Sequence, residues 1–476
     1  MNNYDAIIVG SGPNGLAAAI TLQQAGLRVL VLEGSDTIGG GLRTKPLTLP
    51  GYMHDVCSAI HPMAATSPFF AKLPLREHGL EFIYPPVAAA HPFDDGTAAV
   101  LQHSLAHTAQ LLDVDAQQYT KLVGAVVNMW PDIVDDILGP LHFPQHPLTL
   151  ARFGMNALLP ATTIAKRFAS PKTKGLWAGM AAHAIQPLDN ATTAAIGLVL
   201  MAAGHLHGWP VPKGGSVSIA NALASYFTSL GGKIETGRYV QSFDDLPAAK
   251  AILLDVTPRQ LLKMAGNKLG GLYKWQLEKF RYGMGVFKID WALSHPIPFT
   301  AAACRQAGTV HLGATLEEIE LSEKLSSRGR HAEKPFVLLA QPSLFDDTRA
   351  PSGCHTAWAY CHVPHGSTQD MTDAIENQVE RFAPGFKDCI LARHTFNTVQ
   401  MEAYNPNYIG GDINGGILDW RQLYSRPAVR ISPYSIPLKG VYICSSSTPP
   451  GGGVHGMCGY HAARKALKDV FGLTSK

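Results

Sequence analysis

The chain alternates between short apolar runs bounded by turn residues and longer segments in which small and apolar residues have helical spacing. A short run rich in Val, Ile and Leu is typical of a buried strand, and a period of about 3.6 residues is typical of a helix. Strands are predicted at 5–9, 28–32, 233–235, 251–254, 285–293, 335–341 and 440–444. Helices are predicted at 16–25, 218–230, 371–382 and 457–467. This succession predicts an α/β fold.

The first strand, helix and second strand carry the glycine pattern of a dinucleotide-binding site. Gly10 permits a tight strand-to-helix turn, Gly12 lets the backbone approach a pyrophosphate, and Gly15 lets the helix pack close to the sheet. Free N–H groups at the helix N-terminus would bind the pyrophosphate. Glu33 follows the second strand, where a carboxylate accepts hydrogen bonds from a ribose diol. The predicted contacts of an adenine dinucleotide in this unit are Gly10, Gly12, Pro13, Asn14, Gly15, Glu33 and Gly34.

The segment after Glu33 resembles one found in a large flavoprotein superfamily. Residues 37–44 (TIGGGLRT) are similar to the GG-x-x-R/T segment of amine oxidases, carotenoid desaturases and Rab GDP-dissociation inhibitors. This resemblance implies that the dinucleotide is FAD, with glycine backbone beside the diphosphate and ribityl chain. The Arg expected directly after the glycine pair is Gly41 here, and the guanidinium moves to Arg43. The implied contacts are Gly40, Gly41, Leu42 and, at the diphosphate, Arg43.

A second glycine-rich segment, near the end of the chain, completes the predicted cofactor site. The strand 440–444 is followed by residues 445–456 (SSSTPPGGGVHG) and then by the helix 457–467. Glycine backbone can lie beside a ligand, and the helix N-terminus would direct its positive end towards it. The expected partner is the pyrimidine edge of the flavin, where negative charge gathers on reduction. The expected contacts here are Ser446, Gly453, Val454 and His455.

Taken together, these segments resemble the phytoene desaturase-related family of NAD(P)/FAD-dependent oxidoreductases. The likeness includes 49–62 (LPGYMHDVCSAIHP), 358–367 (WAYCHVPHGS) and 405–416 (NPNYIGGDINGG), so it runs nearly end to end. It implies an FAD-binding Rossmann-like domain interleaved with an α+β substrate domain, and backbone near Val240 at the adenine. It also implies an enzyme that oxidises a lipophilic small molecule by desaturation, isomerisation or related hydride transfer to flavin N5.

No single linker divides the chain, because the two predicted domains interleave. The FAD-binding domain is expected at 1–80, 211–265 and 396–476, and the substrate domain at 81–210 (helical) and 266–395 (sheet).

Composition and charge narrow the function further. The net charge of +3 is too small to predict a nucleic-acid surface. The seven cysteines form no CxxC pair, which argues against a disulfide reductase and favours a reduced, cytoplasmic chain. Because the first strand begins at Asp5, we expect no signal peptide. The longest apolar stretch, 194–204, is shorter than the roughly 18 residues of a membrane span.

Peripheral membrane contact is one of two interpretations of the segment 148–168. It mixes apolar residues with Arg152, Lys166 and Arg167 in a way that could lie on a bilayer. Alternatively, it is a helix of the substrate domain with a solvated basic edge. The sequence does not predict an oligomeric state.

Two residues are candidates for the catalytic base that accepts a proton during oxidation. His455 could serve, or it could fill space and donate to a carbonyl. Asp55 could serve, or it could cap a turn. Ser58 follows Asp55 and is expected near the flavin, and Cys57 between them is better interpreted as a packed residue than as a redox thiol. Trp358, Tyr360 and Tyr404 are candidates for an apolar substrate wall or for core packing.

No nicotinamide-binding unit and no metal site are predicted. Without a second strand–glycine–helix motif, electrons would leave the flavin for oxygen, a quinone or another small acceptor. The HxxxH pair at 103–107 lacks a third ligand, and Pro144 argues against a regular helix that would place His142 and His146 on one face. Two other functions remain open: a flavin amine oxidase, and a lipid-binding protein like the Rab GDP-dissociation inhibitors, without redox turnover.

Overall fold

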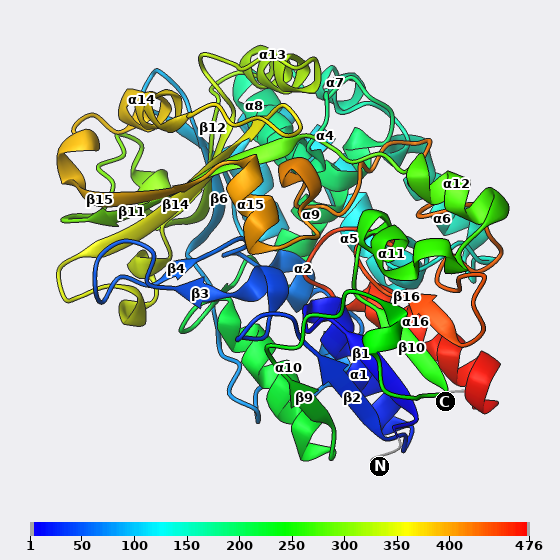
Figure 1. Cartoon of the computed structure of the whole chain (residues 1–476). Coiled ribbons are helices and arrows are strands. Elements are labelled where there is room, and N and C mark those ends of the chain that lie inside the picture. The colour runs from blue at the N-terminus through cyan, green and yellow to red at the C-terminus, as the bar shows by residue number, and fades with distance from the viewer. Residues whose placement is uncertain (1–3, 474–476) are drawn as a thin grey trace.

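Two sheets organise the protein in the computed structural model, which describes residues 4–473 (Figure 1). The first has five strands in the order β16-β10-β1-β2-β9, and every neighbouring pair is parallel. Its strands are β1 (Ala6–Val9), β2 (Val29–Leu32), β9 (Lys233–Glu235), β10 (Ala251–Leu254) and β16 (Val441–Ile443). They come from three separate regions of the chain, as an interleaved domain requires. The predicted α/β, Rossmann-like fold is confirmed.

Three helices pack beside this sheet: α1 (Pro13–Gln24), α10 (Val217–Ser229) and α16 (Met457–Ala466), and α1 packs against each of the other two. Figure 1 shows the N-terminal α1 next to the C-terminal α16. Their backbones meet so closely that a Cβ on Gly459 would lie 1.8 Å from the carbonyl oxygen of Asn14. A Cβ on Gly15 would lie 2.1 Å from the carbonyl oxygen of Gly10, so Gly15 permits the close helix–strand packing predicted for it.

The second sheet has seven strands in the order β15-β11-β14-β13-β12-β6-β7. Its pairs are antiparallel except for β12 and β6, which are parallel. The strands are β6 (Val87–Pro92), β7 (Ala98–Leu101), β11 (Gly285–Leu293), β12 (Ala307–Leu312), β13 (Val337–Ala340), β14 (His355–Val363) and β15 (Ile390–Phe396). Short two-stranded pairs are formed by β3 (Thr44–Lys45) with β4 (His54–Asp55) and by β5 (Phe82–Ile83) with β8 (Val211–Pro212).

The region 81–210 is therefore not purely helical, which corrects the sequence-based expectation. Its first part supplies β6 and β7 to the seven-stranded sheet. Three of the six residues of β6 are alanine, which has little strand preference, so pairing with β12 more than 200 residues away decides the conformation. The remainder is helical: α3 (Leu105–Leu111), α4 (Ala116–Tyr119), α5 (Ala125–Ile137), α6 (Pro147–Ala157), α7 (Ala161–Ala165), α8 (Pro171–Ala181) and α9 (Thr193–Leu206).

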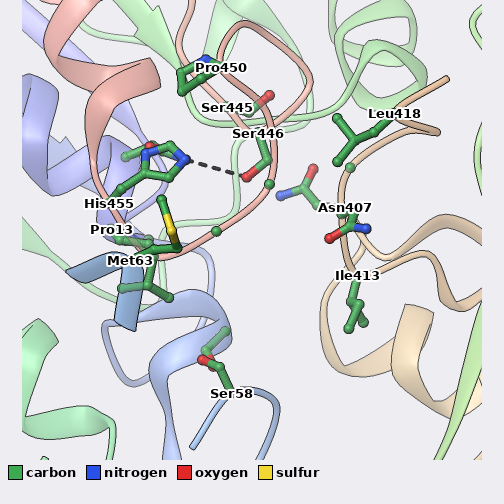
Figure 2. Close-up of a pocket in the computed structure, with 18 of the residues that line it drawn as sticks. Pro13, Ser58, Met63, Asn407, Ile413, Leu418, Ser445, Ser446, Pro450 and His455 are labelled. Atoms are coloured by element: carbon green, nitrogen blue, oxygen red, sulfur yellow. Dashed lines mark hydrogen bonds between the residues drawn. The ribbon is translucent and has the colours of Figure 1, made fainter. Parts of the chain in front are cut away.

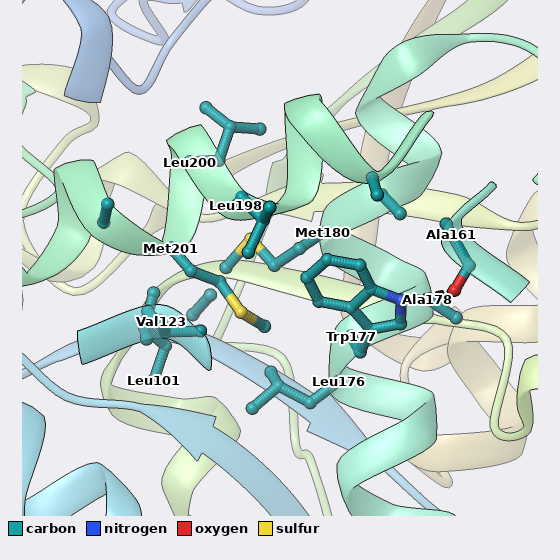
Figure 3. Close-up of a cluster of buried hydrophobic side chains, with 14 of the residues drawn as sticks. Leu101, Val123, Ala161, Leu176, Trp177, Ala178, Met180, Leu198, Leu200 and Met201 are labelled. Carbon is teal, nitrogen blue, oxygen red and sulfur yellow. Dashed lines mark hydrogen bonds between the residues drawn. The ribbon is translucent and has the colours of Figure 1, made fainter. Parts of the chain in front are cut away.

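Trp177 on α8 anchors the core of this helical layer (Figure 3). Its ring is fully buried, and its indole N–H donates to the carbonyl of Ala161 at 2.8 Å. Met180, Leu198 and Met201 fill the space around it. This hydrogen bond joins α7 to α8, which packs on β6, β7 and β12 of the seven-stranded sheet.

The other helices connect the two sheets or flank them. They are α2 (Pro62–Ala65), α11 (Pro258–Ala265), α12 (Gly271–Glu278), α13 (Leu316–Ser327), α14 (Thr372–Phe382) and α15 (Thr398–Tyr404). Within residues 4–473, no helix combines the length and the apolar character needed to cross a membrane.

Candidate active site

A cavity of about 1440 Å³ runs from the glycine turn after β1 to the seven-stranded sheet and to α6. Sites for a single small molecule are typically about 300–1,000 Å³. The cavity is therefore large enough for a dinucleotide together with a second ligand. Its dinucleotide end lies beyond the carboxyl ends of the parallel strands, where open α/β sheets bind ligands.

The structure brings nearly all the predicted cofactor contacts to this cavity. Those in its wall are Gly10, Gly12, Pro13, Asn14, Glu33, Gly34, Gly40, Gly41, Leu42, Arg43, Ser58, Val240, Ser446, Gly453, Val454 and His455. Gly15 lies behind the wall, against the backbone of Gly10. Figure 2 shows Pro13 and Ser58 from the N-terminal region and Ser446 and Pro450 from the C-terminal segment around the same space. Their contact with FAD stays a prediction.

The glycine-rich turns meet at backbone distance, as a dinucleotide cradle requires. A Cβ on Gly40 would lie 3.3 Å from the Cα of Gly12, and Gly10 has a φ of +99° that L side chains rarely adopt. The N-terminus of α1, where backbone N–H groups have no partner within the helix, lies at this point. These features fit a pyrophosphate and leave no room for side chains on the glycines.

Glu33, the predicted ribose ligand, is held in place by four hydrogen bonds. One oxygen accepts from the backbone N–H and the hydroxyl of Ser11, at 3.0 and 2.5 Å. The other accepts from the N–H of Ser35 at 2.9 Å and from the guanidinium of Arg43 at 3.1 Å. Arg43 also donates to the carbonyl of Thr37 at 2.8 Å. A buried guanidinium needs a carboxylate partner, so this geometry favours a role for Arg43 in orienting Glu33 over the expected diphosphate contact.

Asp255, which the sequence analysis missed, lies directly beside the predicted pyrophosphate position. Its carboxylate accepts the N–H of Gly15 at 3.0 Å and lies 2.8 Å from where a Cβ on Gly12 would be. Burial raises its pKa to about 7, with the bond from Gly15 opposing and the charge of Glu33 adding to the rise. The signal available in the sequence was its place directly after β10, at the carboxyl end of a parallel strand.

The C-terminal glycine segment is fastened to the rest of the protein by its serines. The Ser445 hydroxyl donates to the carbonyl of Val256, and that of Ser447 to the carbonyl of Gly415, both at 2.7 Å. Asn14 donates to the hydroxyl of Ser446 at 3.4 Å, which ties the two predicted cofactor segments together.

His455 lines the cavity, but its ring makes a hydrogen bond within its own segment of the chain. Its Nδ1 accepts the backbone N–H of Met457, the first residue of α16, at 3.0 Å. Burial lowers its pKa to about 4, so the ring is neutral at neutral pH. With Nδ1 already accepting, the neutral ring carries its hydrogen on Nε2 and can donate but not take a proton. The geometry therefore favours the non-catalytic interpretation of His455.

Asp55 lies outside the cavity wall, which corrects its assignment as a candidate base. Its carboxylate pairs with the guanidinium of Arg349 at 2.8 Å and accepts from the N–H of Ser216 and the hydroxyl of Thr44. Arg349 and these hydrogen bonds hold the pKa of this fully buried carboxyl below its usual value despite desolvation. Asp55 is thus a structural anion that joins β4 to the start of α10.

The far part of the cavity is mostly apolar. Its wall includes Ile60, Leu150, Ile196, Val199, Trp209, Leu338, Trp358 and Tyr360. Tyr404, the third aromatic candidate, also lines the cavity. The 405–416 loop supplies Asn405, Asn407, Ile413 and Asn414 to the wall. Asp412 accepts two backbone N–H groups within the loop and the N–H of Gly283, which tethers the loop to the segment before β11.

His183 is a polar residue of this apolar part that sequence reasoning missed. Its Nε2 lies 2.9 Å from the Nε2 of buried His311 on β12, and burial lowers the pKa of both rings. Nothing near His183 in the sequence indicated a partner 128 positions away. Among residues 4–473, no three His, Cys, Asp or Glu side chains gather as metal ligands would.

Comparisons with known proteins support the sequence resemblance. A family model described as an NAD(P)-binding Rossmann-like domain matches residues 8–73. The chain is 26% identical, over 98% of its length and 94% of the relative's, to pyridine nucleotide-disulfide oxidoreductase domain-containing protein 2 of Mus musculus. It is 22% identical to a polypeptide of the limonene dehydrogenase of Castellaniella defragrans, covering 98% of this chain and 95% of that protein.

Two further likenesses concern a desaturase and an amine oxidase. A phytoene desaturase (lycopene-forming) of Pseudescherichia vulneris is 22% identical over 54% of this chain and 55% of its own length. The solved structure of cyclohexylamine oxidase from Brevibacterium oxydans matches with a TM-score of 0.58 at 14% identity, over 99% of this chain and 98% of that one. The structural likeness shows the fold. Together the comparisons confirm the resemblance to the phytoene desaturase-related oxidoreductases and support an FAD/NAD(P) oxidoreductase family.

Proposed function

We propose that this protein is an FAD-dependent oxidoreductase that oxidises a lipophilic small molecule by desaturation, isomerisation or related hydride transfer to flavin N5. One observation carries the proposal. A single cavity connects the glycine cradle after β1 with a wall of apolar side chains on the seven-stranded sheet and the helical layer. A bound dinucleotide and a lipophilic molecule would therefore share one enclosure.

Each part of the cradle has a task in holding the cofactor. The N-terminus of α1 would bind the diphosphate, and Glu33, oriented by Arg43, would bind the ribose. The backbone around Val454, just before α16, would contact the pyrimidine edge. When bound, FAD supplies the hydride acceptor of the reaction.

The apolar wall supports a lipophilic substrate. The relatives named for limonene and phytoene act, by those names, on apolar hydrocarbons. Enclosure by apolar residues also excludes water from the reacting atoms. The acceptor that finally receives the electrons would be oxygen, a quinone or another small molecule, because the chain shows no second dinucleotide motif.

We propose that His183, and not His455 or Asp55, is the base that accepts the proton released during oxidation. Its ring lines the apolar part of the cavity and is neutral at neutral pH, because burial lowers its pKa to about 3. His311 stands behind it at hydrogen-bond distance, and a hydrogen bond between the two rings can orient His183.

Absorbance and anaerobic reduction test this proposal. Purified protein should absorb near ~450 nm as oxidised flavoproteins do. Adding fractions of a lipid extract without oxygen should bleach this band, whereas cyclohexylamine and NADPH should not. Bleaching by the amine alone would favour a flavin amine oxidase, to which the fold is also similar. A flavin that no lipid reduces would favour a lipid-binding protein without turnover, and colourless protein would overturn the FAD assignment.

A further inference from the structure

The mouth of the cavity is rimmed by apolar side chains that face solvent. Leu141 and Met155 line the cavity although they are 69% and 68% exposed, and so do the half-exposed Leu158 and Tyr424. They come from α6, the segment before it and the segment after residue 416. Monomeric soluble proteins rarely expose contiguous apolar patches, and such patches mark sites of interaction.

Helix α6 extends this rim into an apolar stripe on the protein surface. Leu148, Ala151, Met155 and Leu158 recur at intervals of three and four residues and are exposed, so they share one face of the helix. Phe153, by contrast, points inward and is buried. Leu148 is 86% exposed. Phe143, just before the helix, is 87% exposed.

A shallow basic pocket of about 350 Å³ lies directly beside the stripe. Its wall contains Lys121, Arg152 and Arg167, and Met155 belongs to the walls of both this pocket and the cavity. None of the three cations forms an ion pair with any residue in the range 4–473. Arg167 donates to the side-chain oxygen of Asn156 at 2.7 Å. Three unpaired cations at one spot favour an anionic partner.

We propose that this surface, made of residues 141–158 with Lys121 and Arg167, docks the protein on an anionic lipid bilayer. Phe143 and the stripe of α6 would enter the interface, while the basic pocket would lie at the phosphate groups. The cavity mouth would then open towards the lipid. Entry of a lipophilic substrate by this route rests on the proposed function, whereas the docking does not.

The charge distribution favours a bilayer over a second copy of the chain. In a twofold dimer the same patch faces itself, so three unpaired cations would oppose three others. Two of the acidic side chains of α5 already lie beside histidines of the rim segment. Asp136 is paired with His142 at 2.9 Å, and Asp132 lies 3.9 Å from His146.

Flotation with lipid vesicles tests the docking surface. The full chain would be mixed with vesicles of phosphatidylcholine alone or of equal parts phosphatidylcholine and phosphatidylglycerol. Three cations near an anionic surface contribute on the order of 100-fold in partitioning, because each is worth about fivefold. We therefore expect strong flotation with the anionic vesicles, little with the neutral ones, and weakening as salt is added.

Matched variants locate the surface. Phe143→Ser with Leu148→Ser, and separately Arg152→Gln with Arg167→Gln, should each reduce flotation at least tenfold, which corresponds to about 1.4 kcal/mol. Leu321→Ser with Arg328→Gln, on and just after α13 and outside the cavity wall, should leave it unchanged. Thermal unfolding checks that every variant is folded.

Two outcomes would overturn the proposal. One is that the unmodified protein does not float, or that neither the Phe143/Leu148 variant nor the Arg152/Arg167 variant changes its flotation. The other is a concentration-dependent dimer, measured by light scattering, that Phe143→Ser with Leu148→Ser abolishes, since the surface would then bind a second copy. If the protein floats as expected but no lipid reduces its flavin, the docking surface would be supported and only the proposed function would be contradicted.

Discussion

Replacing Asp255 with asparagine should change how the stability of the protein depends on pH. In the folded protein the pKa of this buried carboxyl is about 7, against 3.8 for an ordinary Asp. Each pKa unit is worth about 1.4 kcal/mol, so keeping Asp255 ionised in the fold costs roughly 4 kcal/mol. Because the pKa of Asp255 is higher in the folded protein than in the unfolded chain, the protonated side chain stabilises the fold fully only below the unfolded pKa. This stabilisation is lost as the pH rises through about 7. Asparagine has the shape of the protonated acid and can still accept the N–H of Gly15.

The assay is chemical unfolding of the nucleotide-free protein and of Asp255→Asn over a range of pH. Near pH 4 the two should be almost equally stable, and by about pH 8 the variant should be more stable by up to roughly 4 kcal/mol. Comparing the two proteins cancels every other titrating group. The variant should also bind FAD more tightly than the unmodified protein at about pH 8, because no ionised carboxylate then faces the diphosphate. Parallel curves, with a difference that does not change between these pH values, would refute the reasoning.

Four other substitutions test the site. Gly12→Val should abolish the flavin absorbance by placing a side chain against Asp255 and the diphosphate, whereas Gly270→Ala, with open space around it, should retain it; equal flavin content in both would contradict the cradle. Asp55→Ala removes the close partner of the buried Arg349 guanidinium and leaves it only Asp346 at 4.0 Å, so it should cost about 3–5 kcal/mol in urea unfolding; an unchanged midpoint would mean that the ion pair is dispensable. His183→Ala should slow anaerobic flavin reduction by roughly 10²–10⁴-fold with flavin still bound. His455→Ala should instead weaken FAD binding, and the reverse pattern would restore His455 as the base.

Much of the candidate cofactor site was predictable because its signals are local. Gly10, Gly12 and Gly15 act through the backbone of one turn, and Glu33 follows within the same strand–helix–strand unit. Chemical roles were harder to predict. Arg43, Asp55 and His455 were recognised as notable, yet their roles depend on partners elsewhere: Arg43 serves Glu33, and Asp55 is neutralised by a residue 294 positions away.

The sequence by itself determined the Rossmann-like unit, the strands β10 and β11 and the segments that would surround a dinucleotide, because backbone geometry and apolar periodicity are written in neighbouring residues. Only the tertiary structure decided that alanine-rich β6 pairs with β12, that Asp255 lies at the N-terminus of α1, and that His183 meets His311. These contacts form between segments that are distant along the chain. Their partners are chosen by which faces become buried together, and a buried carboxyl or imidazole takes its protonation state from that burial.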